Sequence, residues 1–522
     1  MVRASKKTGS NGLRSALRFA AVLVGFGIAP PGWSAPATSR SVPRFFVPDF
    51  RSRDGGDETS WVALAVSEGL RSRLARSGTT RAVSEMRTAG VMSRFSDGAG
   101  PAQERIVQTA RFLGADCAVS GVVGKTDGGY VVDIRLSPVR PEGSDRTRSV
   151  QAPSVRALLD ASTDAVFDLS GIRLDETRRT RMLGFPGGSD SAVEYHAKAV
   201  RALRADKPND ALYYVAESIQ YDGTFRPTLK LLGQMNLAAG NEREVLAIFE
   251  RLLRQAKLDE DPLDETFALI QIGMCKQRRG ELSVAEKYYR AALTQAEQLG
   301  LPDQQALALG TLANLRVDQK QLDESLTLLK RRLELLESEG DRLAMGPAYF
   351  TIGLVHAAKG QIPQVLDCLD RAAKLADEVG MPSDKAAALF QTGKILEEQG
   401  RLDEALTAYQ ASLKLTDELE TGSAYRQIAE IYERQGKLDE ALEMLRKAEA
   451  TLSKRKAYAP QANCLSRIAR LQMKRNQPAE ALKTMTEAVE ILRDLKHPDL
   501  ESYERQLAEM RGQGSSRPPS SP

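Results

Sequence analysis

The side chains that could do chemistry are few in this sequence, and they lie far apart. No two cysteines form a C-x-x-C pair, and no His/Cys cluster has the short spacing that a metal site needs. The sequence therefore predicts no metal site. We expect four separate buried thiols, since each cysteine lies in an apolar segment; disulfide pairing in an oxidising compartment is the alternative. The cysteines are Cys117, Cys275, Cys368 and Cys464, and the histidines are His196, His356 and His497.

A short segment, Gly124-Lys125-Thr126, resembles the end of a phosphate-binding loop. That loop needs a glycine five residues before the Gly-Lys pair, and Val119 stands there instead. The loop also joins a strand to a helix, whereas this segment connects two strand-like runs. The patterns G-x-S-x-G and H-E-x-x-H do not occur. We therefore predict no catalytic residues and no cofactor, and we expect that the protein is not an enzyme.

The first 37 residues have the pattern of a secretory signal. Five basic residues and no acidic ones precede an apolar run over 19–29, and Ala35-Pro36-Ala37 resembles a cleavage site. We expect residues 1–37 to be cleaved and the protein to be exported to the periplasm; an uncleaved inner-membrane anchor is the alternative. Loss of the signal removes five positive charges and takes the formal net charge from +4 to −1. A nearly neutral chain lacks the basic footprint of nucleic-acid binding, so we expect no nucleic-acid partner and only indirect membrane contact.

Residues 38–172 alternate strand-like and helix-like segments. Helices are predicted where apolar residues recur near every 3.6 positions, and strands where β-branched and aromatic residues run together. Turn residues at 125–129 place a hairpin between two strands. This order predicts a small α/β domain with a partly antiparallel sheet. The predicted elements are strands at 44–47, 80–83, 117–123 and 130–136 and helices at 61–75, 103–113 and 155–169.

Short motifs in this domain resemble those of the TolB amino-terminal-like family, which is related to the curli-assembly lipoprotein fold. The resemblance implies an envelope-associated domain and supplies no catalytic residues. The motifs are Phe46-Val47-Pro48-Asp49-Phe50 before a helix, Leu113-Gly114-Ala115-Asp116, Val119-Ser120-Gly121-Val122-Val123, and Val131 followed by Asp133-Ile134-Arg135-Leu136.

Residues 190–511 are rich in helix formers and contain one pattern eight times. Each unit has a turn residue at a predicted helix–helix corner, a small residue seven positions before it, and a larger apolar residue nine positions after it. The turn residue lets one helix stop and the next begin. The small residue lets the two helices approach closely. The corners are Asp206, Gly240, Gly280, Lys320, Gly360, Gly400, Gly436 and Asn476.

This spacing resembles the tetratricopeptide repeat, a helix pair with a basic unit of 34 residues. Most corners here are 40 residues apart, which predicts longer helices or a longer loop between repeats. The resemblance implies an all-α superhelix, an α-solenoid whose neighbouring units must stack to bury their faces. The chain is therefore predicted to be multidomain, with the α/β domain, a solvated basic linker at 173–189, eight repeats at 190–511 and a disordered tail at 512–522. Contact of the linker with an acidic partner or anionic lipid is the alternative.

In the tetratricopeptide family, the first helix of each pair lines an inner groove. Carried onto this sequence, those positions predict a groove with an apolar middle and a charged carboxy-terminal part, which suits an amphipathic or extended peptide. The alternative is that its apolar members belong to the core between repeats. No carboxylate clamp is expected, because Gly310 and Pro347 stand where the family's clamp needs lysines. The predicted groove residues are Lys230, Gln234, Met274, Arg278, Asn314, Phe350, Leu354, Phe390, Lys394, Arg426 and Arg470.

Together these features predict an exported, non-enzymatic scaffold of the bacterial envelope that binds a protein partner in the repeat groove. One alternative is an assembly component of an export apparatus whose α/β domain oligomerises. Another is a sensor or regulator that binds a small ligand in the α/β domain. Neither alternative has a motif of its own in the sequence.

Overall fold

The computed structural model describes residues 42–77, 79–83, 102–140, 143–176, 179, 182, 188–415 and 421–515. The predicted signal lies outside these residues. The chain forms two compact units. Unit 1 holds the residues up to Gln361 together with Glu378–Gly380, and unit 2 holds Ile362–Asp377 and the residues from Met381 onward. Over the ranges that the structure describes, no helix has the length and apolar character needed to cross a membrane.

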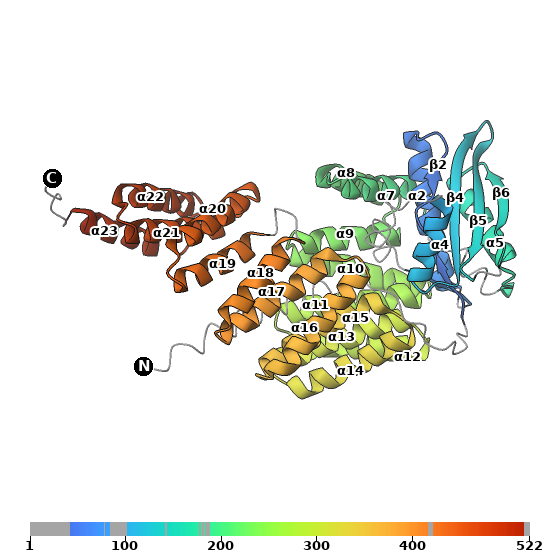
Figure 1. Ribbon diagram of the computed structural model, residues 1–522. Coiled ribbons are helices and arrows are strands. Elements are labelled where there is room, and N and C mark those ends of the chain that lie inside the picture. The colour runs from blue at the N-terminus through green and yellow to red at the C-terminus, as the bar shows by residue number, and fades with distance from the viewer. Residues whose placement is uncertain are drawn as a thin grey trace. The chain divides into compact units, whose positions relative to one another are not determined.

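Unit 1 begins with a small α/β domain built on a mixed sheet (Figure 1). The strands run in the order β3-β1-β4-β5-β6, and β2 pairs with β4. β1 is parallel to β3 and β4, whereas β4–β5 and β5–β6 are antiparallel. The predicted mixed sheet and its hairpin are therefore confirmed. The elements are β1 Arg44–Phe46, β2 Arg51–Ser52, α2 Asp57–Arg76, β3 Arg81–Ala82, α4 Ala102–Phe112, β4 Cys117–Thr126, β5 Gly129–Pro138, β6 Arg146–Ala152 and α5 Val155–Ser170.

The two faces of this sheet are covered by different helices. α2 and α5 pack on one face, where Leu70, Val119 and Leu158 are fully buried. α4 lies on the other face, because Ser120, which alternates with Val119 along β4, donates a hydrogen bond to Gln103 at 3.0 Å. Two strands, β2 and β6, are absent from the predicted elements. β6 is an edge strand of mostly exposed polar residues, so no apolar alternation reveals it.

Parts of the predicted linker belong to the α/β domain. Met182 is fully buried in that domain's core, and Arg179 pairs with Asp164 at 2.7 Å. These two residues correct the expectation of a fully solvated linker over 173–189. Met182, an apolar residue within the basic run, anchors this segment in the core of the α/β domain.

The rest of the described chain is a long series of helices, in which α7 to α22 form pairs and α23 follows as a single helix. All eight predicted corner residues join the two helices of a pair, and each has a positive φ, between 54° and 79°. The corner prediction is therefore confirmed. α23 extends to Ser515, four residues past the predicted boundary at 511. The helices are α7 Asp190–Arg204, α8 Pro208–Tyr221, α9 Arg226–Ala238, α10 Glu242–Leu258, α11 Pro262–Arg278, α12 Leu282–Gln298, α13 Pro302–Asp318, α14 Leu322–Ser338, α15 Arg342–Ala358, α16 Ile362–Glu378, α17 Pro382–Glu398, α18 Leu402–Leu413, α19 Gly422–Arg434, α20 Leu438–Lys454, α21 Tyr458–Lys474, α22 Pro478–Asp494 and α23 Leu500–Ser515.

The 40-residue interval comes from longer helices and not from a longer loop. From Gly240 to Gly400, a residue with positive φ stands every 20 positions. The helices between these residues, α10 to α17, have 17 residues each. The connections within a helix pair and those between pairs are therefore short turns of the same type, each with one residue in the left-handed conformation.

Small and large residues are matched across the helix pairs. A Cβ atom added at Gly233, Gly273 or Gly393 would lie 2.6, 2.5 or 2.7 Å from the aromatic ring that faces it. In four pairs whose larger residue is aliphatic, the small residue is alanine; Gly353, seven residues before its corner, is the exception. The glycine–aromatic pairs are Gly233–Phe249, Gly273–Tyr289 and Gly393–Tyr409, and the alanine pairs are Ala199–Val215, Ala313–Leu329, Ala429–Leu445 and Ala469–Met485.

Substitution of Gly273 by alanine is expected to destabilise unit 1 by about 1–3 kcal/mol, because the methyl group overpacks against the Tyr289 ring. The double variant Gly273→Ala/Tyr289→Leu should recover part of this loss, since it reproduces the Ala313–Leu329 pair. Urea denaturation of the full chain, followed by circular dichroism, measures both variants. Strictly additive effects of the two substitutions would contradict the size matching.

Candidate partner-binding surfaces

The predicted groove residues all lie on the first helix of a pair, here called an A helix (α7, α9, α11, α13, α15, α17, α19 and α21). Their exposure differs. Met274, Asn314 and Leu354 are only 8%, 7% and 4% exposed. Met274 packs with Tyr289 in the core between repeats. Phe390 lies against the Tyr409 ring, with 5.3 Å between ring centroids. The apolar members therefore contribute mainly to packing, and the polar members provide most of the accessible surface.

In unit 1, the first A helices contact the chain's own α/β domain. Arg76, at the end of α2, inserts between two carboxylates at the start of α11. Its Nε atom lies 2.6 Å from Asp261 Oδ2, and its Nη2 atom lies 2.9 Å from Asp264 Oδ1. Arg226 Nη1, on α9, lies 2.7 Å from the same Asp261 oxygen. Lys230 on α9 also pairs with Asp264, whose side chain is 0% exposed. These five residues form a buried ion cluster that joins the α/β domain to the repeats.

Each charged side chain in the ion cluster favours the ionised form of its neighbours. Burial by itself would raise the pKa of Asp264, but Arg76, Lys230 and Arg226 together hold that pKa well below its usual range. Burial also opposes the charge on Arg76, yet Asp264 and Asp261 raise the pKa of this guanidinium above its usual value. Loss of one member would leave a buried charge without compensation, which is costly. The α/β domain must therefore stay docked for the cluster to remain neutralised.

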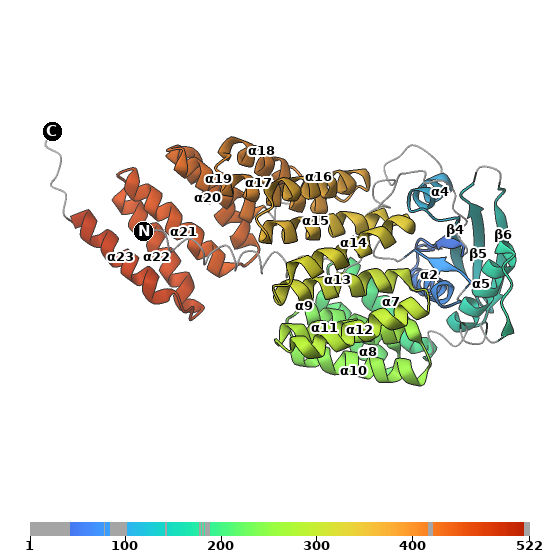
Figure 2. The same cartoon turned by 90° about the horizontal axis from the view of Figure 1, so that it is seen from below.

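Further ionic contacts extend this attachment over several repeats. α2 lies beside α7 in both views of the chain (Figures 1 and 2), and the backbone carbonyl of Glu339, after α14, accepts a hydrogen bond from Arg44 at 3.4 Å. The A-helix surface of the first repeats is thereby turned toward the chain's own domain, with Lys230 and Gln234 included. The additional ion pairs are Arg81–Glu339, Arg201–Asp57 and Arg204–Asp49, and the Nε2 atom of His196 lies 3.5 Å from Glu68.

Unit 2 has a different A-helix surface. Lys394 on α17, Arg426 on α19 and Arg470 on α21 form no ion pair with any residue that the structure describes. Neighbouring cations are neutralised, since Arg434 and Arg467 pair with glutamates at 2.8 Å and 2.7 Å. The buried Nε atom of Arg426 also has no hydrogen-bond partner among these residues. Three successive A helices of unit 2 thus each carry a cation that pairs with no residue in the described ranges.

The described ranges contain no cluster of reactive or metal-ligating side chains. No group of three or more His, Cys, Asp or Glu side chains is placed there to hold a metal ion. All four cysteines are free thiols, as expected, and only Cys117 is partly exposed. Burial raises the pKa of the Cys368 and Cys464 thiols to about 11, which keeps them protonated and unreactive.

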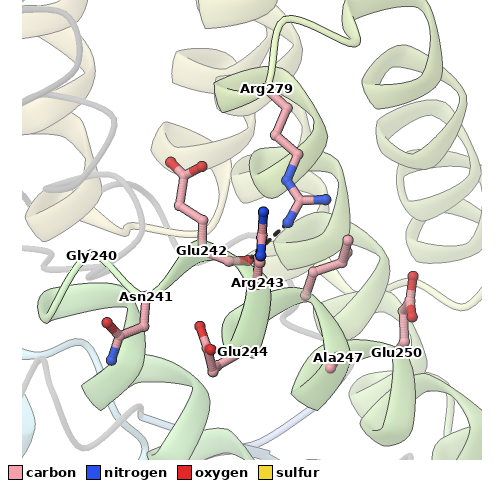
Figure 3. Close-up of a pocket in the computed structure, with 9 residues that line it drawn as sticks. Gly240, Asn241, Glu242, Arg243, Glu244, Ala247, Glu250 and Arg279 are labelled. Atoms are coloured by element: carbon pink, nitrogen blue, oxygen red, sulfur yellow. Dashed lines mark hydrogen bonds between the residues drawn. The ribbon is translucent and has the colours of Figure 1, made fainter.

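A pocket of about 860 Å³ lies at the α9–α10 corner (Figure 3). Arg279 donates a hydrogen bond from its side chain to the backbone carbonyl of Glu242 at 3.3 Å. The side chains of Glu242, Arg243 and Glu244 are exposed and point in different directions. This corner therefore offers no set of convergent groups for catalysis or ion binding.

Residues 265–338, 345–418 and 420–494 match the family model of the tetratricopeptide repeat. The chain therefore contains tetratricopeptide repeats, and its long series of helices forms a tetratricopeptide-repeat solenoid after a small α/β region. A comparison with curated proteins finds no match.

Several solved structures contain similar helical arrays at low sequence identity. The signal transduction ATPase with numerous domains that carries a tetratricopeptide-repeat sensor, from Pyrococcus horikoshii, is 16% identical with a TM-score of 0.47; the match covers 66% of this chain and 53%, about half, of that one. The Rap protein complexed with competence and sporulation factor is 15% identical with a TM-score of 0.41, over 68% and 91% of the two chains. BtubC from P. vanneervenii is 15% identical with a TM-score of 0.38, over 41% and 92%. These likenesses concern the repeat fold and not function.

Sequence patterns do not reveal the ion cluster. Asp261 precedes Pro262 and accepts hydrogen bonds from the backbone N–H groups of Leu263 and Asp264, both at 3.1 Å, so its role as a helix cap is readable from the sequence. Its partner Arg76 lies 185 positions earlier in the chain. No periodicity links two residues at that separation.

Substitution of Asp264 by asparagine is expected to destabilise unit 1 by about 3–5 kcal/mol, since it leaves the buried Arg76 with too little negative charge nearby. Asp323→Asn is the matched control, because its side chain is 89% exposed and pairs with Lys359 at the surface. The control should cost less than about 1 kcal/mol. Thermal unfolding and limited proteolysis of the full chain measure the effect. Equal losses of stability in the two variants would show that the ion cluster stabilises unit 1 no more than a surface ion pair does.

Asp384 on α17 stands three 40-residue intervals after Asp264, but no cation pairs with it in the described chain. Burial raises the pKa of Asp384 from 3.8 to about 6. An acid whose pKa rises on folding stabilises the folded state at low pH, and this contribution is lost as the pH rises from about 4 to about 6. Asp384→Asn should therefore raise the unfolding temperature at pH 7.5 and change it little at pH 4. Destabilisation at pH 7.5 would contradict this assignment.

Proposed function

We propose that this protein is an exported scaffold of the cell envelope, which binds a protein partner on the A-helix surface of unit 2. The pattern at 1–37 supports export, and the motifs that resemble the TolB amino-terminal-like family support a role at the envelope. The tetratricopeptide repeats support protein binding. In this proposal, the α/β domain attaches to an envelope component and the repeats hold the partner.

The observation behind this choice is the contrast between the A-helix surfaces of the two units. In unit 1, the A helix α7 and the start of α11 form buried and surface ion pairs with the chain's own α/β domain. In unit 2, Lys394, Arg426 and Arg470 are cations without a partner in the described chain. Unpaired cations on a recognition surface favour a partner of complementary charge.

The arrangement of these cations indicates the shape of the partner segment. They come from three successive repeats, so a ligand that contacts all three must cross the helices rather than lie along one of them. An extended chain has this form, and solenoids use such surfaces to bind extended segments. We therefore propose that the partner supplies an extended segment with acidic side chains.

Charge reversal on this surface tests the proposal. The variant Lys394→Glu/Arg426→Glu is expected to lower recovery of the partner from envelope extract at least tenfold, because acidic side chains would meet like charges. Arg446→Glu/Lys483→Glu makes the same change in net charge on exposed positions of α20 and α22 and should leave recovery unchanged. Recovery by wild type should also fall as salt is raised. Equal recovery by both double variants would rule out this surface.

Export is tested separately at the amino terminus. If residues 1–37 form a cleaved signal, the protein recovered from the periplasmic fraction should begin at Thr38. Mass spectrometry of the intact protein from fractionated cells identifies its first residue. Recovery of the chain in the cytoplasm with the first 37 residues still attached would overturn the export proposal and leave the charge-reversal result unaffected.

A further inference from the structure

A cavity of about 1020 Å³ lies within unit 1, between the α/β domain and the repeats. One wall comes from α2, β3 and α5 of the α/β domain. The other wall comes from α7, α9 and the beginnings of α11 and α13 in the repeats. Every residue that lines the cavity belongs to unit 1, so it is separate from the A-helix surface of unit 2. Its volume is at the upper end of the range for small-molecule sites, which are mostly apolar with a few placed polar groups.

The lining of this cavity is positively charged. Seven of the side chains that line it are Lys or Arg, whereas four are Asp or Glu. Two of these acids already have cationic partners within the lining. Asp264 pairs with Arg76 and Lys230, and Glu339 pairs with Arg81. A cleft with a surplus of one charge concentrates the field of that charge, so this cavity attracts an anionic ligand and disfavours a cationic one.

One of the lining cations, Arg156 at the start of α5, forms no ion pair with any residue that the structure describes. Among these residues its side chain makes one hydrogen bond, from Nη1 to the backbone carbonyl of Gly188 at 3.2 Å. The Nε and Nη2 groups of Arg156 are therefore available to a ligand. Burial lowers the pKa of the neighbouring Arg73, and the charge of Arg156 lowers it further, although Asp160 opposes both effects. An anion bound at Arg156 would offset this repulsion between the two cations.

Apolar side chains line the cavity close to Arg156. Leu159 follows Arg156 by three positions on α5, so the two side chains lie on the same face of that helix. A Cβ atom added at Gly188 would lie 2.8 Å from the Phe225 ring, which places this ring beside the carbonyl group that Arg156 contacts. Leu231 on α9 adds a further apolar side chain to the repeat wall. The cavity thus combines one available guanidinium with an apolar lining.

We infer that this cavity binds a small amphipathic acid, which places its carboxylate at Arg156 and its apolar body between the two walls. A guanidinium binds a carboxylate through two parallel N–H···O bonds, and the available Nε and Nη2 groups of Arg156 match this arrangement. The ligand contacts both the α/β domain and the repeats, so its binding also stabilises their association. This recognition of a small molecule is independent of the protein partner proposed for unit 2.

Substitution of Arg156 by glutamine tests the role of the guanidinium. The probes are octanoate and 1-octanol, which share one chain length and differ in charge, and both are titrated by calorimetry into the full chain. Wild type should bind octanoate at least about tenfold more tightly than octanol, because hydrogen bonds to charged groups are the stronger ones. Arg156→Gln should abolish this preference and leave octanol binding unchanged. Arg243→Gln removes the same charge at an exposed position of α10 and, as the matched control, should keep the preference.

Substitution of Leu231 by tryptophan tests whether the ligand occupies the cavity. The larger side chain fills part of the space, so both probes should bind at least about tenfold more weakly, while circular dichroism checks that the variant remains helical. Lys394→Glu/Arg426→Glu should bind both probes as wild type does. No preference for octanoate in wild type, equal losses in Arg156→Gln and Arg243→Gln, or undiminished binding by a folded Leu231→Trp chain would overturn the inference. Loss of octanoate binding in the charge-reversal variant would place the anion on unit 2 and would overturn it as well.

Discussion

A carboxylate that is fully removed from water must have its charge compensated, and Asp264 imposes this constraint on unit 1. Three cations meet it, two from α9 of the repeats and one from α2 of the α/β domain. Because one of the three comes from another domain, the α/β domain and the first repeats behave as one body. That coupling decides which parts of the A-helix surface are accessible. Arg76, Lys230 and Asp264 also line a cavity of about 1020 Å³ within unit 1, between the α/β domain and the repeats.

The same repeat architecture therefore serves two purposes in one chain. In unit 1, the first A helices contact the amino-terminal α/β domain. In unit 2, the equivalent helices present cations that the described chain leaves uncompensated. A solenoid permits this division because each repeat contacts mainly its neighbours, so the exposed side chains of one repeat can change without disturbing the others.

The features that could be predicted from the sequence are those with a local cause. A corner such as Gly280 follows from the need for a left-handed residue between two helices, and the alternation in β4 and β5 follows from a sheet with buried faces. Groove positions could be placed on A helices but not ranked by exposure, because the burial of Met274 depends on residues of the next repeat. The Arg76–Asp264 pair and the cavity depend on how two distant segments meet. No residue spacing in the sequence predicts that these two segments are in contact.

The matching of glycine with an aromatic ring has a consequence for how such an array changes over time. A pair such as Gly273–Tyr289 and a pair such as Ala313–Leu329 are both well packed, yet no single substitution converts one into the other without a loss. Alanine opposite tyrosine is overcrowded, and glycine in place of alanine opposite leucine, the combination at positions 353 and 369, gives a weaker helix. The two packings are therefore separate evolutionary solutions with a less stable intermediate between them. Drift at one position is constrained by its partner across the helix pair, even where neither side chain touches a ligand.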